Sequence, residues 1–232
     1  MEPIFKEEDK ILIVAPHQDD ETFGCGGLMS LYGKICDVLL LTDGCKGNIE
    51  NFKNEDELVN IRNKELEIVC EKCGINKLYR LDIKNEKLYK NKNKVYSFDI
   101  SKYTYIFLPN RNEDHIDHKV CYGIFSKMKR RQHSKAQIYE YEVWTPLITP
   151  TWFLDISEVI DKKKELIKIY KSQIEDKDYL KSIIGLNMYR GMYKNYQYCE
   201  AYKYSAYNKF SESIYRLLPD SIKEIIRKAI SR

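Results

Sequence analysis

Short apolar runs alternate with longer amphipathic stretches along most of the chain. The apolar runs predict buried strands at 11–14, 36–41, 78–81 and 103–108. Periodic stretches predict helices at 28–32, 55–73 and 118–129, the second ending at Gly74. A strand with one polar face over 138–144 and a helix from Ser157 to about Lys171 follow. This alternation predicts an α/β protein with a Rossmann-like, mostly parallel sheet and helices on both faces.

Groups that can bind a metal follow the first predicted strand directly. His17, Asp19 and Asp20 come just after 11–14, and in open α/β sheets ligands bind beyond the carboxyl ends of the strands. An imidazole and two carboxylates within four residues are costly to pack together unless a cation neutralises them. Because His17 and Asp20 are three residues apart in a tight turn, both can reach one divalent ion. Asp19 is then free to act on a water.

A second cluster follows another predicted strand. Two of the chain's four histidines, His115 and His118, stand in 112–118, directly after the apolar run 105–109. Each cluster alone fits equally well a strand end with solvated acids. Together, and with no cysteine at their centre, they favour a His/His/Asp site with an open position, which is typical of catalytic zinc.

These residues resemble the paired motifs of a known family. Pro16-His17-Gln18-Asp19-Asp20-Glu21 and His115-Ile116-Asp117-His118 are similar to the PHxDDE and HxDH motifs of the PIG-L (LmbE-like) zinc-dependent N-deacetylases. Further similar segments follow in the expected order: 41–44, Arg62 with Glu65, 155–157 and 170–173. The resemblance therefore spans roughly residues 10–205. Gln18 and Ile116 depart from the pattern, since many members have proline there. Neither departure removes a ligand.

The resemblance implies hydrolysis of an N-acetyl group on an N-acetylglucosamine-like amino sugar, which is the expected small-molecule partner. His17, Asp20 and His118 would hold Zn²⁺, with Fe²⁺ as a substitute, and the metal would activate water and polarise the carbonyl. Asp19 would be the general base. His115, when protonated, would stabilise the oxyanion or protonate the leaving amine.

Two further residues have two interpretations each. Asp117 would either orient an imidazole by a hydrogen bond or be a solvated loop acid. The resemblance implies that Arg62 contacts substrate, but an ion pair with an acid such as Glu65 or Asp43 is an equal alternative.

Composition limits the remaining possibilities. A chain of 232 residues with 43% hydrophobic residues suits a single catalytic domain over 1–232. Its formal charge of +4 is small, and the lysine-rich stretch 84–94 has few interleaved aromatics, so we expect a solvated excursion and no nucleic-acid partner. We expect the polar loop 45–54 to lie over the metal crevice.

The cysteines and the termini bear on location. Seven scattered cysteines and no apolar targeting segment predict a cytoplasmic protein, and the pair Cys70 and Cys73 is interpreted as structural. Residues 208–232 predict a basic amphipathic helical tail, which would touch a membrane surface or, more commonly, dock on its own domain or on a partner subunit. The tyrosine-rich stretch 179–207 fits a sugar-binding rim or core packing. Oligomeric state stays open.

The same residues are compatible with three other functions. The spacing of His115 and Asp117 fits a mononuclear iron oxygenase, although this leaves His17, Asp19 and Asp20 unexplained. The segment 24–27, Gly-Cys-Gly-Gly, suggests a tight turn before a helix, which is a feature of nucleotide-binding domains. It matches the GxGxxG motif poorly, because Met29 occupies the third glycine position. A non-catalytic sugar-binding protein with the same fold is a third possibility. The sequence does not define the sugar or its aglycone.

Overall fold

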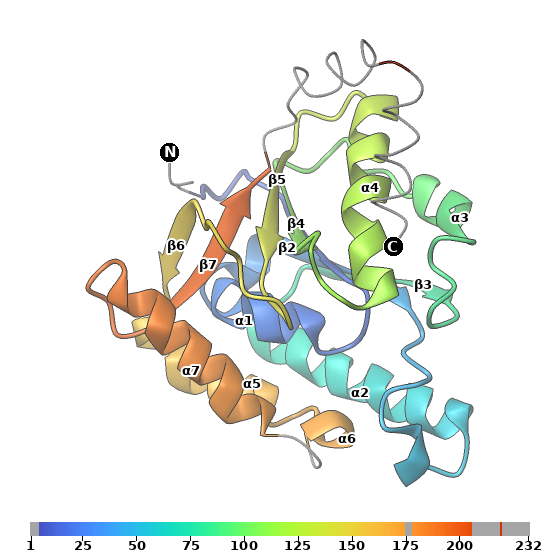
Figure 1. Ribbon diagram of the computed structural model, residues 1–232, viewed down its shortest axis with the longest axis horizontal. Helices are drawn as coiled ribbons and strands as arrows, with labels where there is room; N and C mark the ends of the chain where they lie inside the picture. The colour runs from blue at the N-terminus through green and yellow to red at the C-terminus, as the bar shows by residue number, and fades with distance from the viewer. Residues whose placement is uncertain (1–4, 175–177, 206–218, 220–232) are drawn as a thin grey trace.

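The computed structural model describes residues 5–174, 178–205 and Pro219 (Figure 1). Within these residues one sheet runs in the order β3-β2-β1-β4-β5-β7-β6. The strands from β3 to β5 are parallel, and β7 is antiparallel to both of its neighbours. The strands are β1 (Ile11–Ala15), β2 (Cys36–Thr42), β3 (Lys77–Ile83), β4 (Tyr105–Pro109), β5 (Gln137–Tyr141), β6 (Trp152–Asp155) and β7 (Cys199–Tyr204).

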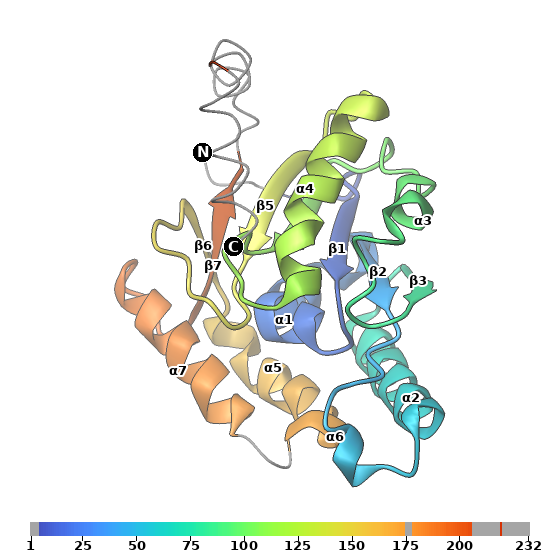
Figure 2. The ribbon, with the colours of Figure 1, turned by 45° about the vertical axis from the view of Figure 1, so that its right-hand side comes forward.

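Helices cover both faces of the sheet, as Figure 2 shows. The α-helices are α1 (Asp20–Tyr32), α2 (Glu55–Cys73), α3 (Lys92–Tyr96), α4 (Ile116–Arg131), α5 (Ile160–Ile167), α6 (Lys171–Ile174) and α7 (Tyr179–Met192). Three short 3₁₀ turns are Gly33–Ile35, Ile49–Asn51 and Ser157–Val159. Helices α3 and α4 lie on one face, and α1 and α2 lie on the other. The predicted fold class is therefore confirmed.

Strand β1 shows why the sheet is buried on both sides. Ile11 and Ile13 belong to the apolar cluster under α1 and α2, whereas Leu12 and Val14 belong to the cluster under α3 and α4. Successive side chains point to opposite faces of a strand, so a continuous apolar run is needed where both faces are covered.

The strand order places the two histidine-acid clusters side by side. Strands β1 and β4 are neighbours, and the chain winds outward from them in opposite directions, to β2 and β3 on one side and to β5 on the other. Such a switch in winding opens a crevice at the carboxyl ends of the two strands. The loops that follow β1 and β4 both begin at this crevice.

Helix α1 begins eight residues earlier than the sequence pattern predicts. It starts at Asp20, and its glycines lie inside the helix rather than in a tight turn before Leu28. A Cβ on Gly24 would stand 2.1 Å from Tyr141 Cδ2, and one on Gly27 would stand 2.3 Å from Ile156 Cγ2. These glycines therefore allow close packing, and the backbone kinks between them at Cys25.

The other helix ends show where local signals suffice. Helix α2 has the predicted ends, with Asn54 capping its start and Gly74 in the left-handed conformation (φ 66°) at its end. Helix α4 begins at Ile116, two residues before the predicted start. The single helix predicted from Ser157 to about Lys171 is wrong, because a 3₁₀ turn, α5 and α6 divide this segment.

Two predictions of solvated residues are corrected. Glu140 and Glu142, expected on a polar strand face, are buried. Each is neutralised by an arginine, Arg111 at 2.5 Å from Glu140 and Arg190 beside Glu142. The stretch 84–94 is not simply solvated, since Leu88 is fully buried in the apolar cluster under α4.

Three further predictions concern the C-terminal tail, the membrane and the cysteines. The predicted tail 208–232 lies outside the described residues except for Pro219. In the part of the chain that is described, no helix combines the length and apolar character needed to cross a membrane. All seven cysteines are buried and none forms a disulfide bond, Cys70 and Cys73 included.

Candidate active site

The loop after β1 carries the first group of polar side chains. Asp20 begins α1, where a carboxylate is favoured by the helix dipole. Its Oδ2 accepts a hydrogen bond from the backbone amide of His17 at 2.9 Å. This contact turns the side chains of His17 and Asp20 toward the same point, and both are buried.

The loop after β4 carries the second group. His115 caps α4, and its Nδ1 accepts a hydrogen bond from the amide of Asp117 at 3.2 Å. His118 lies in the first turn of α4 and is fully buried. The helix start thus directs His118 inward, toward the loop after β1.

Three donor atoms from the two loops meet at one point. The Nδ1 of His17 lies 3.2 Å from the Nε2 of His118 and 3.3 Å from the Oδ2 of Asp20. The Nε2 of His118 lies 3.0 Å from the same carboxylate oxygen. Tetrahedral zinc with bonds of 2.0–2.2 Å separates its ligand atoms by about 3.3–3.5 Å. The spacing and the N, N, O donor set therefore fit one zinc-sized cation.

A third imidazole stands beside this group. Nitrogen atoms of His17, His115 and His118 lie within 4.8 Å of one another. The rings of His17 and His115 meet edge to face with centroids 4.5 Å apart. Because the Nδ1 of His115 is engaged at the helix cap, only its Nε2 can face a ligand.

The electrostatics of the metal-free site also favour a cation. Burial lowers the pKa of His17, but hydrogen bonds to Asp117 and Asp20 outweigh burial and raise this pKa to about 9. Burial raises the pKa of Asp20, and the attraction of His118 outweighs it and lowers this pKa. Without a metal, a proton is thus retained among these groups, and a bound cation would take its place.

Asp19 has an unusual backbone conformation. Its φ of 117° and ψ of −32° are strained for a residue with a side chain. Its amide donates to the Oε2 of Glu21 at 3.1 Å, and its carboxylate lies 3.4 Å from the Nη2 of Arg62. Burial raises the pKa of this carboxyl group well above its usual value, against the attraction of Arg62. A raised pKa makes Asp19 a stronger base than an ordinary carboxylate.

Glu21 and Tyr170 support Asp19 from the core, and sequence reasoning gave them no role. The buried Glu21 carboxylate accepts hydrogen bonds from the Tyr170 hydroxyl and, at 2.6 Å, from the Thr22 hydroxyl. The acid at the end of PHxDDE was the available signal. Its use as a backbone support became visible only in three dimensions.

Arg62 forms an ion pair with an acid, as one of the two alternatives expected, but this acid is neither Glu65 nor Asp43. It donates to the carbonyl oxygens of Gly44 (2.8 Å) and Gln18 (2.7 Å), and its ion-pair partner is Asp19. Glu65, one expected partner, is instead bonded to the amide and hydroxyl of Ser172. Arg62 therefore stiffens the loop around Asp19 while it also lines the cavity.

Asp117 is buried and bonded rather than solvated. Its Oδ2 lies 3.4 Å from the Nε2 of His17 and accepts the amide of Glu86 at 2.7 Å. Its Oδ1 accepts the amide of Leu88 at 3.3 Å. The carboxylate thus contacts an imidazole and also fixes the loop 84–88.

The surroundings of His115 favour its neutral form. Burial and then the repulsion of His17 and His118 lower its pKa to about 4. Since Nδ1 accepts from the Asp117 amide, Nε2 carries the proton. In its neutral form this side chain can donate a hydrogen bond from Nε2.

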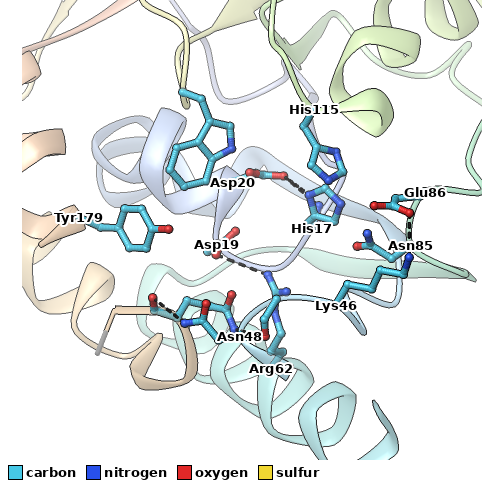
Figure 3. A pocket seen from close by; sticks show the side chains of 13 residues that line it. His17, Asp19, Asp20, Lys46, Asn48, Arg62, Asn85, Glu86, His115 and Tyr179 are labelled. Carbon is cyan, nitrogen blue, oxygen red and sulfur yellow. Dashed lines mark hydrogen bonds and ion pairs between the residues drawn. The ribbon is translucent and has the colours of Figure 1, made fainter. Parts of the chain in front are cut away.

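These groups open into one cavity of about 300 Å³. Figure 3 shows Tyr179 pointing its hydroxyl into the cavity from the side opposite His17 and Asn85. Asp117 and His118 lie beneath the surface, outside the lining. The lining comprises His17, Asp19, Asp20, Lys46, Gly47, Asn48, Arg62, Asn85, Glu86, His115, Trp144, Gln173 and Tyr179.

Part of this lining was missed from the sequence. The loop that carries Lys46 and Asn48 was expected over the crevice, but Asn85 and Glu86 fell in the stretch interpreted as solvated. Lys46 and Glu86, which both line the cavity, form an ion pair at 2.8 Å. Trp144 had no motif to mark it, and Tyr179 was one of many tyrosines in 179–207.

The fold and this site are those of a metal-dependent hydrolase. Comparison with known proteins identifies the family. A model of the PIG-L family, described as GlcNAc-PI de-N-acetylase, matches residues 12–129, about half of the chain. The chain belongs to this family, which confirms the resemblance seen in its motifs.

Individual relatives agree in fold. Diacetylchitobiose deacetylase from Thermococcus kodakarensis is 25% identical over 238 residues, covering 86% of this chain and 84% of that protein. The structure of N,N'-diacetylchitobiose deacetylase from Pyrococcus horikoshii has a TM-score of 0.74 at 20% identity and covers 88% of each chain. The 4-carboxy-2-hydroxymuconate hydratase GalB from Pseudomonas putida has a TM-score of 0.67 at 17% identity, covering 84% of this chain and 95% of that one. The fold alone therefore does not define the reaction.

Two alternative functions lose their structural basis. An iron site built on His115 and Asp117 leaves His17 and Asp20 without a role, whereas the structure places both of them beside His118. The glycines that suggested a nucleotide-binding domain lie inside α1, packed against Tyr141 and Ile156. They therefore form no phosphate-binding loop.

Proposed function

We propose that the chain is a metal-dependent N-deacetylase that hydrolyses the acetamide of an N-acetylglucosamine-like amino sugar. Water adds to the carbonyl carbon, the C–N bond breaks, and acetate and a free amine are released. The observation that carries this proposal is the meeting of the His17, Asp20 and His118 donor atoms within 3.3 Å of one another, next to the basic carboxylate of Asp19.

His17, Asp20 and His118 would hold the cation. Two nitrogens and one oxygen at tetrahedral spacing suit Zn²⁺, and Fe²⁺ is the second candidate because it accepts the same ligands. The bound cation would polarise the carbonyl and acidify a water. Asp117, through the Nε2 of His17, would fix the orientation of that imidazole.

Asp19 would act as the general base. Its raised pKa allows it to take the proton of the attacking water and then to deliver it to the leaving nitrogen. The strained backbone holds the carboxylate at the edge of the cavity. Arg62 would limit its movement and keep it available as a carboxylate.

His115 would stabilise the oxyanion that forms on the carbonyl oxygen. A neutral imidazole with its proton on Nε2 donates a hydrogen bond without taking part in proton transfer. Lys46, Asn48 and Asn85 supply polar groups around the same cavity and would contact sugar hydroxyls.

A cytoplasmic location is also proposed. Its support is the set of seven buried cysteines, none of which forms a disulfide bond, which suits a reducing compartment.

The reaction is tested by acetate release from a panel of N-acetylglucosamine compounds: simple glycosides, a uridine-diphosphate sugar and a phosphatidylinositol conjugate. We expect release with zinc or ferrous iron that stops when a chelator is added. Silence across the panel, with one equivalent of metal bound, would reject N-acetyl hydrolysis while leaving the metal site in place.

A further inference from the structure

A second cavity of about 330 Å³ adjoins the active-site cavity. Two residues, Trp144 and Tyr179, line both. Their rings meet edge to face with centroids 5.2 Å apart. A molecule held by its acetamide near His17 therefore has space beyond this aromatic pair for a further group.

The second cavity is apolar, unlike the first. Apart from the shared pair, its lining residues are mainly hydrocarbon: Phe23, Val143, Pro146, Ile183 and Leu186. The polar exceptions, Asp178 and Ser182, are bonded within α7. Asp178 accepts the amide of Lys181 at 3.0 Å, and the Ser182 hydroxyl donates to the Asp178 carbonyl at 3.1 Å. Burying sugar hydroxyls among such groups would leave them poorly satisfied.

The aromatic wall is anchored to the catalytic loop. Glu113, two residues before His115, accepts hydrogen bonds from the amides of Val143 (3.2 Å), Trp144 (3.0 Å) and Thr145 (3.1 Å). The segment that carries Trp144 is thus tied to the loop that supplies His115. A fixed wall of this kind reduces the conformational entropy that a ligand must remove.

The opposite wall is held by a buried ion pair. Arg190 on α7 pairs with Glu142 and donates to the Leu147 carbonyl at 2.8 Å. This ties α7 to the segment 142–147. Phe23 on α1 completes the link to the metal side, since its ring lies 5.5 Å from Tyr179 and 6.4 Å from Trp144.

We propose that the second cavity is a subsite for an apolar aglycone, an aryl or alkyl group attached to the amino sugar. The proposal rests on the proposed function, because it places the acetamide of the same molecule at the metal site. The polar cavity takes the sugar, and the apolar cavity takes the group that the sugar carries.

Substrate comparison tests the subsite. Three compounds carry the same N-acetylglucosamine unit: its phenyl glycoside, its methyl glycoside and N,N'-diacetylchitobiose, in which a second sugar takes the place of the aglycone. The glycosidic bond is not cleaved, so rate differences report on aglycone binding. We expect kcat/KM for the phenyl glycoside to exceed that for the methyl glycoside by about tenfold or more, from the apolar area that the ring buries. Equal values for these two, or a higher value for the disaccharide than for the phenyl glycoside, would overturn the proposal.

A cavity-filling variant and its control locate the effect. Ser182→Trp adds a large ring at an exposed position on the cavity lining, and we expect it to reduce the phenyl-to-methyl ratio to near one. Met188→Trp adds the same ring on an exposed part of α7 outside the lining and should keep the wild-type ratio. Retention of the ratio in Ser182→Trp would contradict the assignment.

Binding to the metal-free protein separates the subsite from the reaction. The chain has two tryptophans, so fluorescence titration with the phenyl glycoside compares the wild type with Trp144→Phe, in which Trp152 remains. We expect a saturable change in the wild type that is lost in Trp144→Phe, and about tenfold weaker binding of the methyl glycoside. Such binding without acetate release would reject the proposed reaction but keep the subsite. Absence of phenyl-selective binding would reject the subsite even if acetate is released.

Discussion

The loops that follow β1 and β4 carry similar residues but are held in place differently. The first is supported from within the core. Asp19 adopts a strained backbone, its amide bonds to Glu21, and Glu21 in turn accepts the Tyr170 hydroxyl. All three residues are buried. This support fixes the direction of a carboxylate at the cost of local strain.

The second loop is supported by the walls of the cavities. Glu113 binds three successive amides of the segment 143–145, and Asp117 binds the amides of Glu86 and Leu88. The first loop therefore positions the chemistry, and the second couples its histidines to the segments that line the cavities. Apart from the metal ligands themselves, changes in the first loop should reduce turnover or stability, and changes in the second should alter metal and substrate affinity.

The strongest contrast is expected between neighbouring carboxylates of the first loop. Asp19→Asn should keep its metal and lose at least about 10²-fold in kcat, because the base is removed while the ligands remain. Asp20→Asn should fail to retain the metal on dialysis. The measurements are acetate release and metal content by atomic emission. Loss of metal in Asp19→Asn would instead make Asp19 a ligand.

The second loop should respond through metal affinity. Asp117→Asn weakens the contact to His17 and the hold on the loop 84–88, and we expect about 10- to 100-fold weaker metal binding. Competition with a chromogenic chelator measures this change. Asp114→Asn, an exposed acid in the same loop, is the control that should bind normally. An unchanged affinity in Asp117→Asn would show that His17 needs no orienting partner.

The core support of the first loop should appear as stability. Tyr170→Phe removes one hydrogen-bond donor from the buried Glu21 carboxylate and should lower the free energy of unfolding by about 1–3 kcal/mol. Denaturant titration compares it with Tyr89→Phe, at an exposed tyrosine. If both variants unfold at the same midpoint, the hydrogen bond from Tyr170 to Glu21 does not contribute to the free energy of unfolding as predicted.

The smallest effect is expected at the aromatic wall. Glu113→Gln keeps the size of the side chain but replaces one acceptor oxygen with a donor, so that part of the hold on the segment 143–145 is lost. We expect KM to rise by about two- to tenfold with kcat little changed, corresponding to one or two weakened hydrogen bonds. Steady-state kinetics with a single glycoside suffice. A loss confined to kcat would contradict the proposed separation of roles.

The sequence predicted those parts of the fold that are set by local signals. Buried strands require continuous apolar runs, and Asn54 and Gly74 mark the ends of α2 by their capping chemistry. The start of α1 was missed because Gly24 and Gly27 resemble a turn locally, whereas they are required by side chains more than 100 residues away. Such tertiary contacts leave no local pattern.

The candidate site shows the same division. The residues His17, Asp20 and His118 could be selected from the motifs and the family resemblance that these motifs carry, and the structure brings them together. Asn85, Glu86 and Trp144 come from loops without a motif, and they reach the cavity only because Asp117 and Glu113 hold those loops. The ion-pair partner of Arg62, Asp19, was not among the acids named from the sequence for a related reason, since spacing along the chain does not reveal contacts across the crevice.

The most direct test of the central claim is the metal content of His118→Ala beside the wild type after dialysis against a weak chelator. His118 is fully buried, and its Nε2 lies among the three donor atoms. We predict one equivalent of zinc or iron in the wild type, no retained metal in His118→Ala, and loss of acetate release in the same variant. Stoichiometric metal together with full activity in His118→Ala would contradict the assignment of the two loops to one metal site.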